Sequence, residues 1–166
     1  SVADYTGITY SQLGSDITGD ATPSRFGWST SINSEGDIIA AGAIEHDSSK
    51  GYVGVWQYSS ESWSKVESNV NGSAGENFGY SVSLSSLGTK FVASGAQTNV
   101  PVRVYQNSSG WSQLGSNIAP DSGWKSGSSV DCNSNCDRLI FNSWKGSDEH
   151  IAGLVKVYHY TSDWNQ

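Results

Sequence analysis

The sequence predicts an all-β protein made of three four-stranded antiparallel repeats, with each repeat forming one blade of the β-propeller type. The first observation is a repeated segment, because 63–70 (WSKVESNV) returns at 111–118 as WSQLGSNI and has an earlier copy at 10–17, YSQLGSDI. The second is that each period of about 50 residues holds four short strand-like segments separated by turn residues. The third is the lack of any capped segment with helical periodicity. Such sheets bury their apolar faces only against neighbouring sheets.

The first two predicted strands of each repeat differ in their pattern of apolar residues. The first alternates apolar residues with Ser, as expected of a half-buried strand, and spans 27–32, 79–84 and 125–130. A turn rich in Asn, Ser and Gly follows it. The second is a nearly continuous run of small and branched apolar residues, which indicates burial on both faces, and spans 38–43, 91–96 and 139–144.

The third predicted strand carries the pattern Val-x-Val-aromatic. Its copies are Val53–Trp56, Val102–Tyr105 and Val155–Tyr158. Because side chains alternate along a strand, the two Val side chains of each copy share one face and the aromatic ring lies on the other. The fourth strand is the repeated Trp/Tyr-Ser segment.

Two of the repeats resemble FG-GAP repeats, the blades of integrin-alpha-type propellers and of extracellular repeat proteins from marine microbes and algae. The resemblance rests on 26–36 (FGWSTSINSEG) with Ala41-Gly-Ala43, and on 78–88 (FGYSVSLSSLG) with Gly95-Ala96. In the third repeat, Trp124-Lys125 stands in the place of Phe-Gly, and Asn142-Ser-Trp144 replaces Gly-Ala. The acidic calcium loop of that family is missing from all three repeats, so we expect no calcium and no other cofactor.

The chain is predicted to be a single repeat domain over residues 1–166. Its parts are an N-terminal closing strand and loop at 1–25, and blades at 26–77, 78–123 and 124–166, the last without its fourth strand. Closed propellers have four to eight blades. We therefore expect the N-terminal strand to complete a blade by strand exchange or ring closure.

The expected partners are further copies of the chain, in a homo-oligomer or polymer, or neighbouring blades of a longer chain. Strand exchange would donate Tyr5–Ile17 to the edge formed by Val155–Tyr160. A protein or glycan ligand is also open. The net charge of −7 disfavours nucleic acid and anionic membrane surfaces. No apolar run reaches the roughly 18 residues of a membrane-spanning helix.

The cysteines and glycosylation sequons favour an extracellular location, secreted or at the cell surface. Cys132 and Cys136 have no second Cys pair and no nearby His, which argues against a metal site and favours a disulfide across a tight turn. Asn71 and Asn107 begin Asn-x-Ser sequons and are predicted glycosylation sites.

Few residues suggest chemistry. Glu45-His46-Asp47 and Asp148-Glu149-His150 are weak candidates for a divalent metal, although solvated acidic loops explain them better. Three Trp residues near the loop-rich face are candidates for stacking on a sugar ring: Trp28, Trp124 and Trp144. We predict no catalytic residues and no enzyme activity, because the chain has no G-x-S-x-G elbow and no recurring Ser-His-Asp set.

The leading hypothesis is a noncatalytic extracellular structural or adhesion module. It would assemble by strand complementation at blade edges and bind a partner through acidic loops. The alternatives are a lectin-like propeller that binds carbohydrate and a secreted hydrolase.

Overall fold

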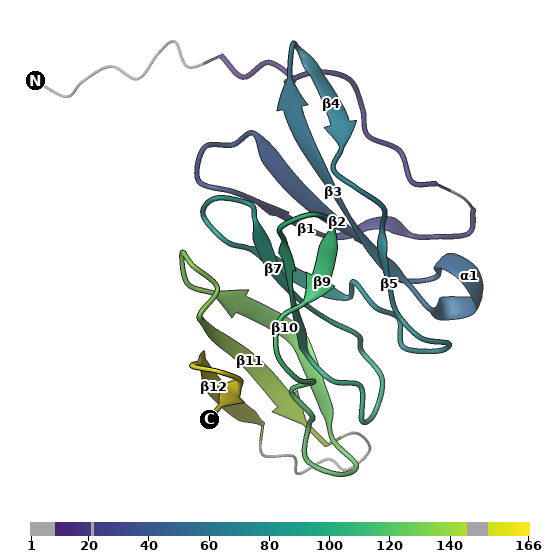
Figure 1. Ribbon diagram of the computed structural model, residues 1–166. Helices are drawn as coiled ribbons and strands as arrows, with labels where there is room; N and C mark the ends of the chain where they lie inside the picture. The colour runs from purple at the N-terminus through teal and green to yellow at the C-terminus, as the bar shows by residue number, and fades with distance from the viewer. Residues whose placement is uncertain (1–8, 21, 146–152) are drawn as a thin grey trace, which may run out of the picture.

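The chain folds into three antiparallel β-sheets that follow one another in chain order, as Figure 1 shows. The structure is a computed structural model and describes residues 9–20, 22–145 and 153–166. Within each sheet, the strands are ordered as they occur in the sequence. The prediction of three four-stranded antiparallel repeats is therefore confirmed.

The sheets have the following bounds. The first contains β1 (Phe26–Ile32), β2 (Ile38–Ala43), β3 (Tyr52–Ser59) and β4 (Ser62–Lys65), and the two-residue β5 (Val70–Asn71) also pairs with β3. The second contains β6 (Ser81–Leu84), β7 (Lys90–Ser94), β8 (Arg103–Asn107) and β9 (Trp111–Gln113). The third contains β10 (Lys125–Cys132), β11 (Arg138–Trp144), β12 (Leu154–Tyr160) and β13 (Trp164–Asn165). One four-residue turn, α1 (His46–Ser49), lies between β2 and β3.

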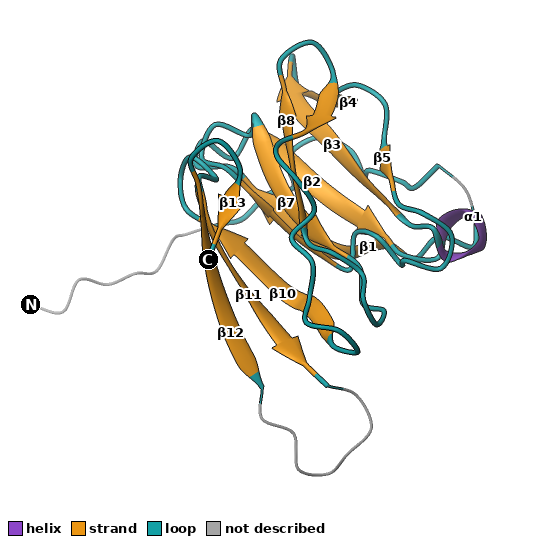
Figure 2. Ribbon diagram, turned by 60° about the horizontal axis from the view of Figure 1, so that its bottom comes forward, coloured by secondary structure: helices purple, strands orange, loops and turns teal. Residues whose placement is uncertain are grey.

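The sheets stack face against face, and two apolar cores lie between them (Figure 2). We call the face that lies against the preceding sheet the leading face, and the face that lies against the following sheet the trailing face. In the first core, the trailing residues Ala40, Val53 and Val55 pack with the leading residues Val82, Leu84 and Phe91. In the second core, Val92, Val102 and Val104 pack with Val130, Leu139 and Phe141. The Val pair of each third strand is thus part of the trailing face.

The turn between the first two strands repeats its hydrogen bonds. The side-chain oxygen of Asn33 accepts hydrogen bonds from the amides of Asp37 and Ile38, at 3.1 and 2.9 Å. Asn133 does the same in the third sheet, at the same distances. Gly36 and Gly88 adopt φ of 76° and 66° in this turn, and Cys136 takes the same position with φ of 45°. The side chain of Cys136 forms the predicted disulfide with Cys132.

The third sheet differs from the prediction in two ways. Its fourth strand is present, although it is short, because β13 pairs with β12 at Tyr160 and His159. The register of its first strand also differs by two residues from the alignment of 125–130 with 79–84. Val130 pairs with Phe141 as Val82 pairs with Ala93, so Ser126-Gly127, and not Trp124-Lys125, corresponds to Phe78-Gly79.

Backbone conformation explains that register. Gly27, Gly79 and Gly127 have φ of 83°, 88° and 76°, so the glycine with positive φ marks the equivalent position in every sheet. The third repeat has Ser126 in place of Phe before this glycine, so the sequence pattern alone did not identify the equivalent position.

The N-terminal segment is not a strand over residues 9–17 in the single chain, so ring closure within the chain is not observed, and strand exchange with another copy stays a prediction. It runs beside β4 in Figure 1, where the indole N–H of Trp63 donates to the backbone oxygen of Leu13 at 2.8 Å. The segment has the sequence of a fourth strand, but the described chain contains no third strand preceding it with which it could pair. No helix in the described ranges is long and apolar enough to cross a membrane.

Candidate interaction surface

In the first weak candidate for a metal site, Glu45-His46-Asp47, both carboxylates form ion pairs. The Glu45 carboxylate lies 2.9 Å from Nε of Arg25, and Asp47 lies 2.6 Å from the amine of Lys50. The Lys50 hydrogen bond lowers the pKa of the Asp47 carboxyl. Across residues 9–20, 22–145 and 153–166, no three His, Cys, Asp or Glu side chains are grouped to hold a metal ion. The second candidate cluster, Asp148, Glu149 and His150, lies outside the described residues.

The three Trp candidates for sugar stacking do not form one site. Trp28 is 44% exposed, with the Arg25 guanidinium 5.6 Å from its ring centroid and the Tyr80 ring 5.4 Å away. Trp144 has the Lys125 amine over its ring at 5.1 Å. Trp124 is half-buried, and no aromatic contact among the described residues joins any two of the three.

The two sequon asparagines differ in accessibility. Asn71 is exposed at the end of β5. Asn107 is half-buried at the end of β8, where its side-chain oxygen accepts a hydrogen bond from the Gly110 amide at 3.1 Å. Asn71 is therefore the more accessible of the two predicted glycosylation sites.

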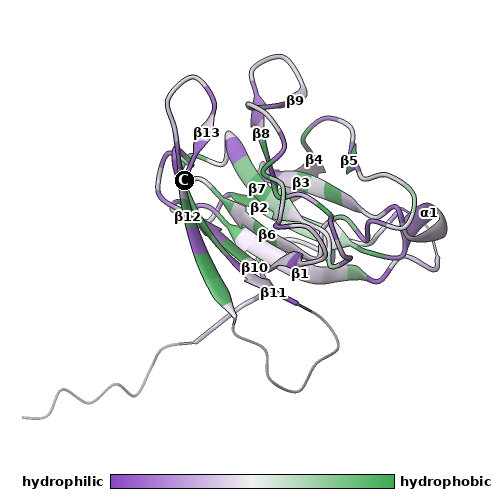
Figure 3. Ribbon diagram, turned by 90° about the horizontal axis from the view of Figure 1, so that it is seen from below, coloured by the Kyte–Doolittle hydropathy of each residue, from purple (hydrophilic) through white to green (hydrophobic). Residues whose placement is uncertain are grey.

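The trailing face of the third sheet is an apolar surface that no other described residues cover. Three of its residues are exposed by 42%, 69% and 55%: Ile140, Val155 and Val157. Their equivalents in the first two sheets are at most 2% exposed because the next sheet covers them: Ala40, Val53, Val55, Val92, Val102 and Val104. In Figure 3 the apolar stretch of β12 lies at the outer end of the stack. Residues of this kind in the first two sheets form the protein's core.

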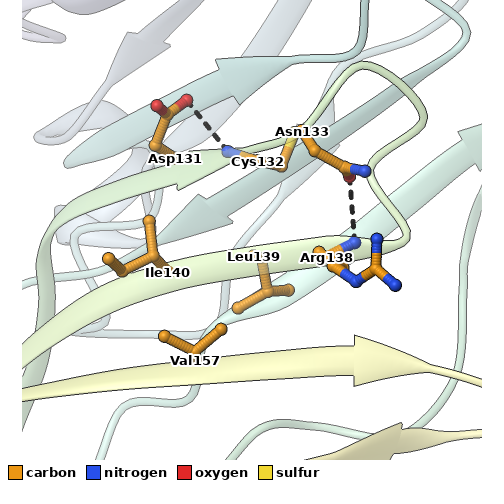
Figure 4. Close-up of a pocket in the computed structure, with 7 residues that line it drawn as sticks. All are labelled: Asp131, Cys132, Asn133, Arg138, Leu139, Ile140 and Val157. Carbon is orange, nitrogen blue, oxygen red and sulfur yellow. Dashed lines mark hydrogen bonds between the residues drawn. The ribbon is translucent and has the colours of Figure 1, made fainter.

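A pocket of about 300 Å³ lies on this face. Its lining residues are Asp131, Cys132, Asn133, Arg138, Leu139, Ile140 and Val157. Figure 4 shows Ile140 and Val157 side by side on neighbouring strands, and they are direct partners in the β11–β12 register. Two polar side chains of the rim are engaged, because Asp131 and Asn133 accept backbone hydrogen bonds from Cys132 and Arg138. Ile140 and Val157 form the apolar part of the lining, and the Arg138 guanidinium lies at its rim.

The opposite end of the stack is open in part, because Ala41 and Trp56 on the leading face of the first sheet are only 3% and 6% exposed, whereas the residues of its first strand are accessible. Ile32, on the leading face of the first sheet, is 60% exposed, whereas its equivalent Leu84 is 7% exposed. Thr30 is exposed, whereas its equivalent Val82 is buried against the first sheet. The described chain thus ends in two different faces, one of each kind that the internal interfaces bring together.

The backbone of β12 is also incompletely paired. In the first two sheets, the residue that follows the fourth strand donates its amide to the carbonyl of the second Val of the third strand. Val66 donates to Val55, and Leu114 donates to Val104, both at 2.8 Å. In the third sheet, β13 pairs only with His159 and Tyr160. Among the described residues, no amide takes this place opposite the carbonyl of Val157.

The open faces were not among the site residues predicted from the sequence, although the signal was present. The Val-x-Val-aromatic pattern occurs three times, and the described chain has only two sheet-to-sheet interfaces. Among the described residues, one copy of the Val pair is therefore not covered by another sheet, and this copy is Val155 and Val157.

Comparison with models of known protein families finds none that matches this chain, and a search of curated proteins finds no match either. The FG-GAP resemblance therefore rests on the quoted residues.

Proposed function

We propose that this chain is a noncatalytic structural or adhesion module of the β-propeller type that works by associating with further sheets of its own kind. The observation that carries the proposal is the trailing face of the third sheet, where Val155 and Val157 are exposed and their equivalents are core residues. Leaving such side chains in water costs about 1.5 to 3 kcal/mol each relative to full burial. A surface of this kind marks an interaction site.

The two kinds of contact expected from the sequence have unequal support. Among the described residues, the sheet ends have exposed apolar side chains, Ile32 at one end and Val155 and Val157 at the other, and the Val157 carbonyl has no backbone partner. The acidic loop is weaker, because Arg25 and Lys50 neutralise the charges of Glu45 and Asp47. We therefore assign the association to the ends of the stack.

A largely buried ion pair supports a structural role. Arg103 of β8 donates two hydrogen bonds, at 2.8 and 2.6 Å, to the carboxylate of Glu76 in the segment before β6. These bonds lower the pKa of Glu76. A general acid working near neutral pH needs a carboxyl pKa that is raised. Glu76 therefore fits a fixed ion pair that ties a connecting segment to its sheet.

An extracellular location agrees with the Cys132–Cys136 disulfide, since such bonds persist in oxidising compartments. The exposed glycosylation sequon at Asn71 also agrees with an extracellular location.

Light scattering after size-exclusion chromatography tests the proposal over a range of protein concentrations. We expect a mass above the 17.7 kDa of one chain at micromolar concentration. A mass of one chain at every concentration up to about 1 mM, the range of the weakest specific complexes, would contradict it.

Carbohydrate binding is a second candidate because the Trp28 ring is 44% exposed beside Arg25 and Tyr80. An aromatic face of this kind stacks on the apolar side of a sugar ring. Titration with soluble polysaccharides should then change the Trp fluorescence of the native chain and not that of Trp28→Ala. Equal responses of the two proteins would remove this candidate.

A further inference from the structure

We infer that two copies of this chain associate head to tail, so that the leading face of the first sheet of one copy covers the trailing face of the third sheet of the other. This inference rests on the proposed function and specifies its partner and geometry. The contact would be a third example of the interface that already occurs twice within the chain.

The apolar residues of the two faces are complementary by position. Within the chain, the leading residue Leu84 packs in the same core as the trailing residues Ala40 and Val55. The equivalent of Leu84 in the first sheet is Ile32, and the equivalents of Ala40 and Val55 in the third sheet are Ile140 and Val157. Head-to-tail contact therefore brings Ile32 of one copy to the pocket lined by Ile140 and Val157 of the other.

The indole hydrogen bonds show that the N-terminal segment already has half of the repeated contact. Trp111 donates to the carbonyl of Val66 at 3.3 Å, and Trp164 donates to that of Leu114 at 2.9 Å. Trp63 donates to Leu13 in the same way, at 2.8 Å. The Leu13 carbonyl therefore contacts the Trp of the first sheet in the same way as the Val66 carbonyl contacts the Trp of the second sheet.

The second part of the repeated contact is a backbone hydrogen bond, and among the described residues it is not formed by the Leu13 amide or by the Val157 carbonyl. The amides of Val66 and Leu114 donate to the sheet that each of them belongs to, at Val55 and Val104. The amide of Leu13 has no partner among the described residues, and its place in the repeat matches the open carbonyl of Val157. Leu13 of one copy therefore donates to Val157 of the next. Ile17 then pairs with Val155, as Ile118 pairs with Val102.

A third contact repeats along the stack at the turns. The Ser34 amide donates to the Ser86 carbonyl at 3.1 Å, and the Ser86 amide donates to the Ser134 carbonyl at 2.8 Å. In the head-to-tail arrangement, the amide of Ser134 donates to the Ser34 carbonyl of the next copy.

Two charge-introducing variants test the polarity of the contact. Ile32→Asp changes only the leading end and Val157→Asp only the trailing end, and both positions are exposed enough in the single chain for folding to tolerate the change. A carboxylate buried in an apolar interface without a partner costs several kcal/mol, so each variant alone should self-associate at least about 100-fold more weakly than the native chain. Leu87→Asp is the matched control, since Leu87 is a 69% exposed residue in a turn of the middle sheet.

Mixing the two variants gives the decisive result. Ile32→Asp keeps an intact trailing face and Val157→Asp keeps an intact leading face, so an equimolar mixture should form a one-to-one complex by sedimentation analysis while neither variant does so alone. Self-association of Ile32→Asp at the native level would mean that two trailing faces meet, which overturns this inference and leaves the proposed function standing. A mixture that stays dissociated also overturns it. A native chain that never associates overturns both.

Leu13→Pro tests the backbone part of the contact separately. The substitution removes the Leu13 amide hydrogen and keeps the carbonyl that Trp63 contacts. Loss of one hydrogen bond should weaken association by about 3-fold to 10-fold relative to Leu13→Ala. Equal affinities of the two variants would show that the N-terminal segment does not pair with β12.

Discussion

Equivalent valines in the second and third sheets should contribute very differently to the stability of the single chain. Val104 is fully buried between the second and third sheets, whereas Val157, at the same position of the repeat, is 55% exposed. Replacing Val104 with Ala removes two buried carbon atoms, worth about 0.8 kcal/mol each, and leaves a cavity. We expect a total loss of about 2 to 3 kcal/mol in the free energy of unfolding. At Val157 the same change should cost less than about 0.5 kcal/mol.

Urea unfolding followed by Trp fluorescence measures this difference. It should be run at a protein concentration at which light scattering shows single chains. With a denaturant slope of about 2 kcal/mol per molar, Val104→Ala should lower the midpoint by about 1 M or more, while Val157→Ala stays within about 0.3 M of the native chain. As the concentration rises, the midpoint of Val157→Ala should fall further behind that of the native chain, because association buries Val157 only at high concentration. Equal losses for the two variants in single chains would refute the exposure of Val157 on the trailing face of the third sheet.

Three further predictions concern contacts within the chain. Reducing the Cys132–Cys136 disulfide should lower the free energy of unfolding by about 2 kcal/mol, the loop-closure value for so short a loop, and no change in the urea midpoint would contradict this. Arg103→Gln should destabilise the fold by about 2 to 4 kcal/mol at neutral pH, because it leaves the largely buried Glu76 carboxylate without its cation. Since the folded-state pKa of Glu76 is lowered from 4.5, the stabilisation by the pair is present above that pH and is lost as the pH falls through the lower folded value. The stability gap between native chain and variant should therefore close in acid, and a gap that is independent of pH would disprove the assignment. Trp111→Phe, which removes an indole donor to the first sheet, should cost about 1 kcal/mol, and an unchanged unfolding curve would show that this hydrogen bond contributes nothing.

The period of the sequence was enough to predict three four-stranded antiparallel sheets and the face of each third strand that carries the Val pair. The Val-x-Val-aromatic pattern defines the trailing face because strand side chains alternate between the two faces, and that geometry holds whatever the neighbours are. The disulfide followed from the spacing of Cys132 and Cys136 and from the lack of other metal ligands.

Other features depended on contacts between repeats, which a local pattern does not encode. The register of β10 followed the positive φ of Gly127, whereas the alignment relied on an aromatic residue that the third repeat lacks. The N-terminal segment has a strand sequence but no partner strand in the described chain, so the strand does not form. The acidic residues near α1 were interpreted mainly as a solvated loop, and their basic partners Arg25 and Lys50 could not be assigned to them from spacing alone.

Hydrogen exchange of the native chain at low and high protein concentration tests the head-to-tail contact most directly. The contact orders two segments that are far apart in the sequence and at opposite ends of the stack. We predict that the amides of residues 9–17 and the outer edge of β12 become protected together as the concentration rises, while the amides of β6 to β9 remain equally protected throughout. Exchange of both end segments at the same rate at every concentration, or protection that builds up elsewhere on the chain, would contradict the account.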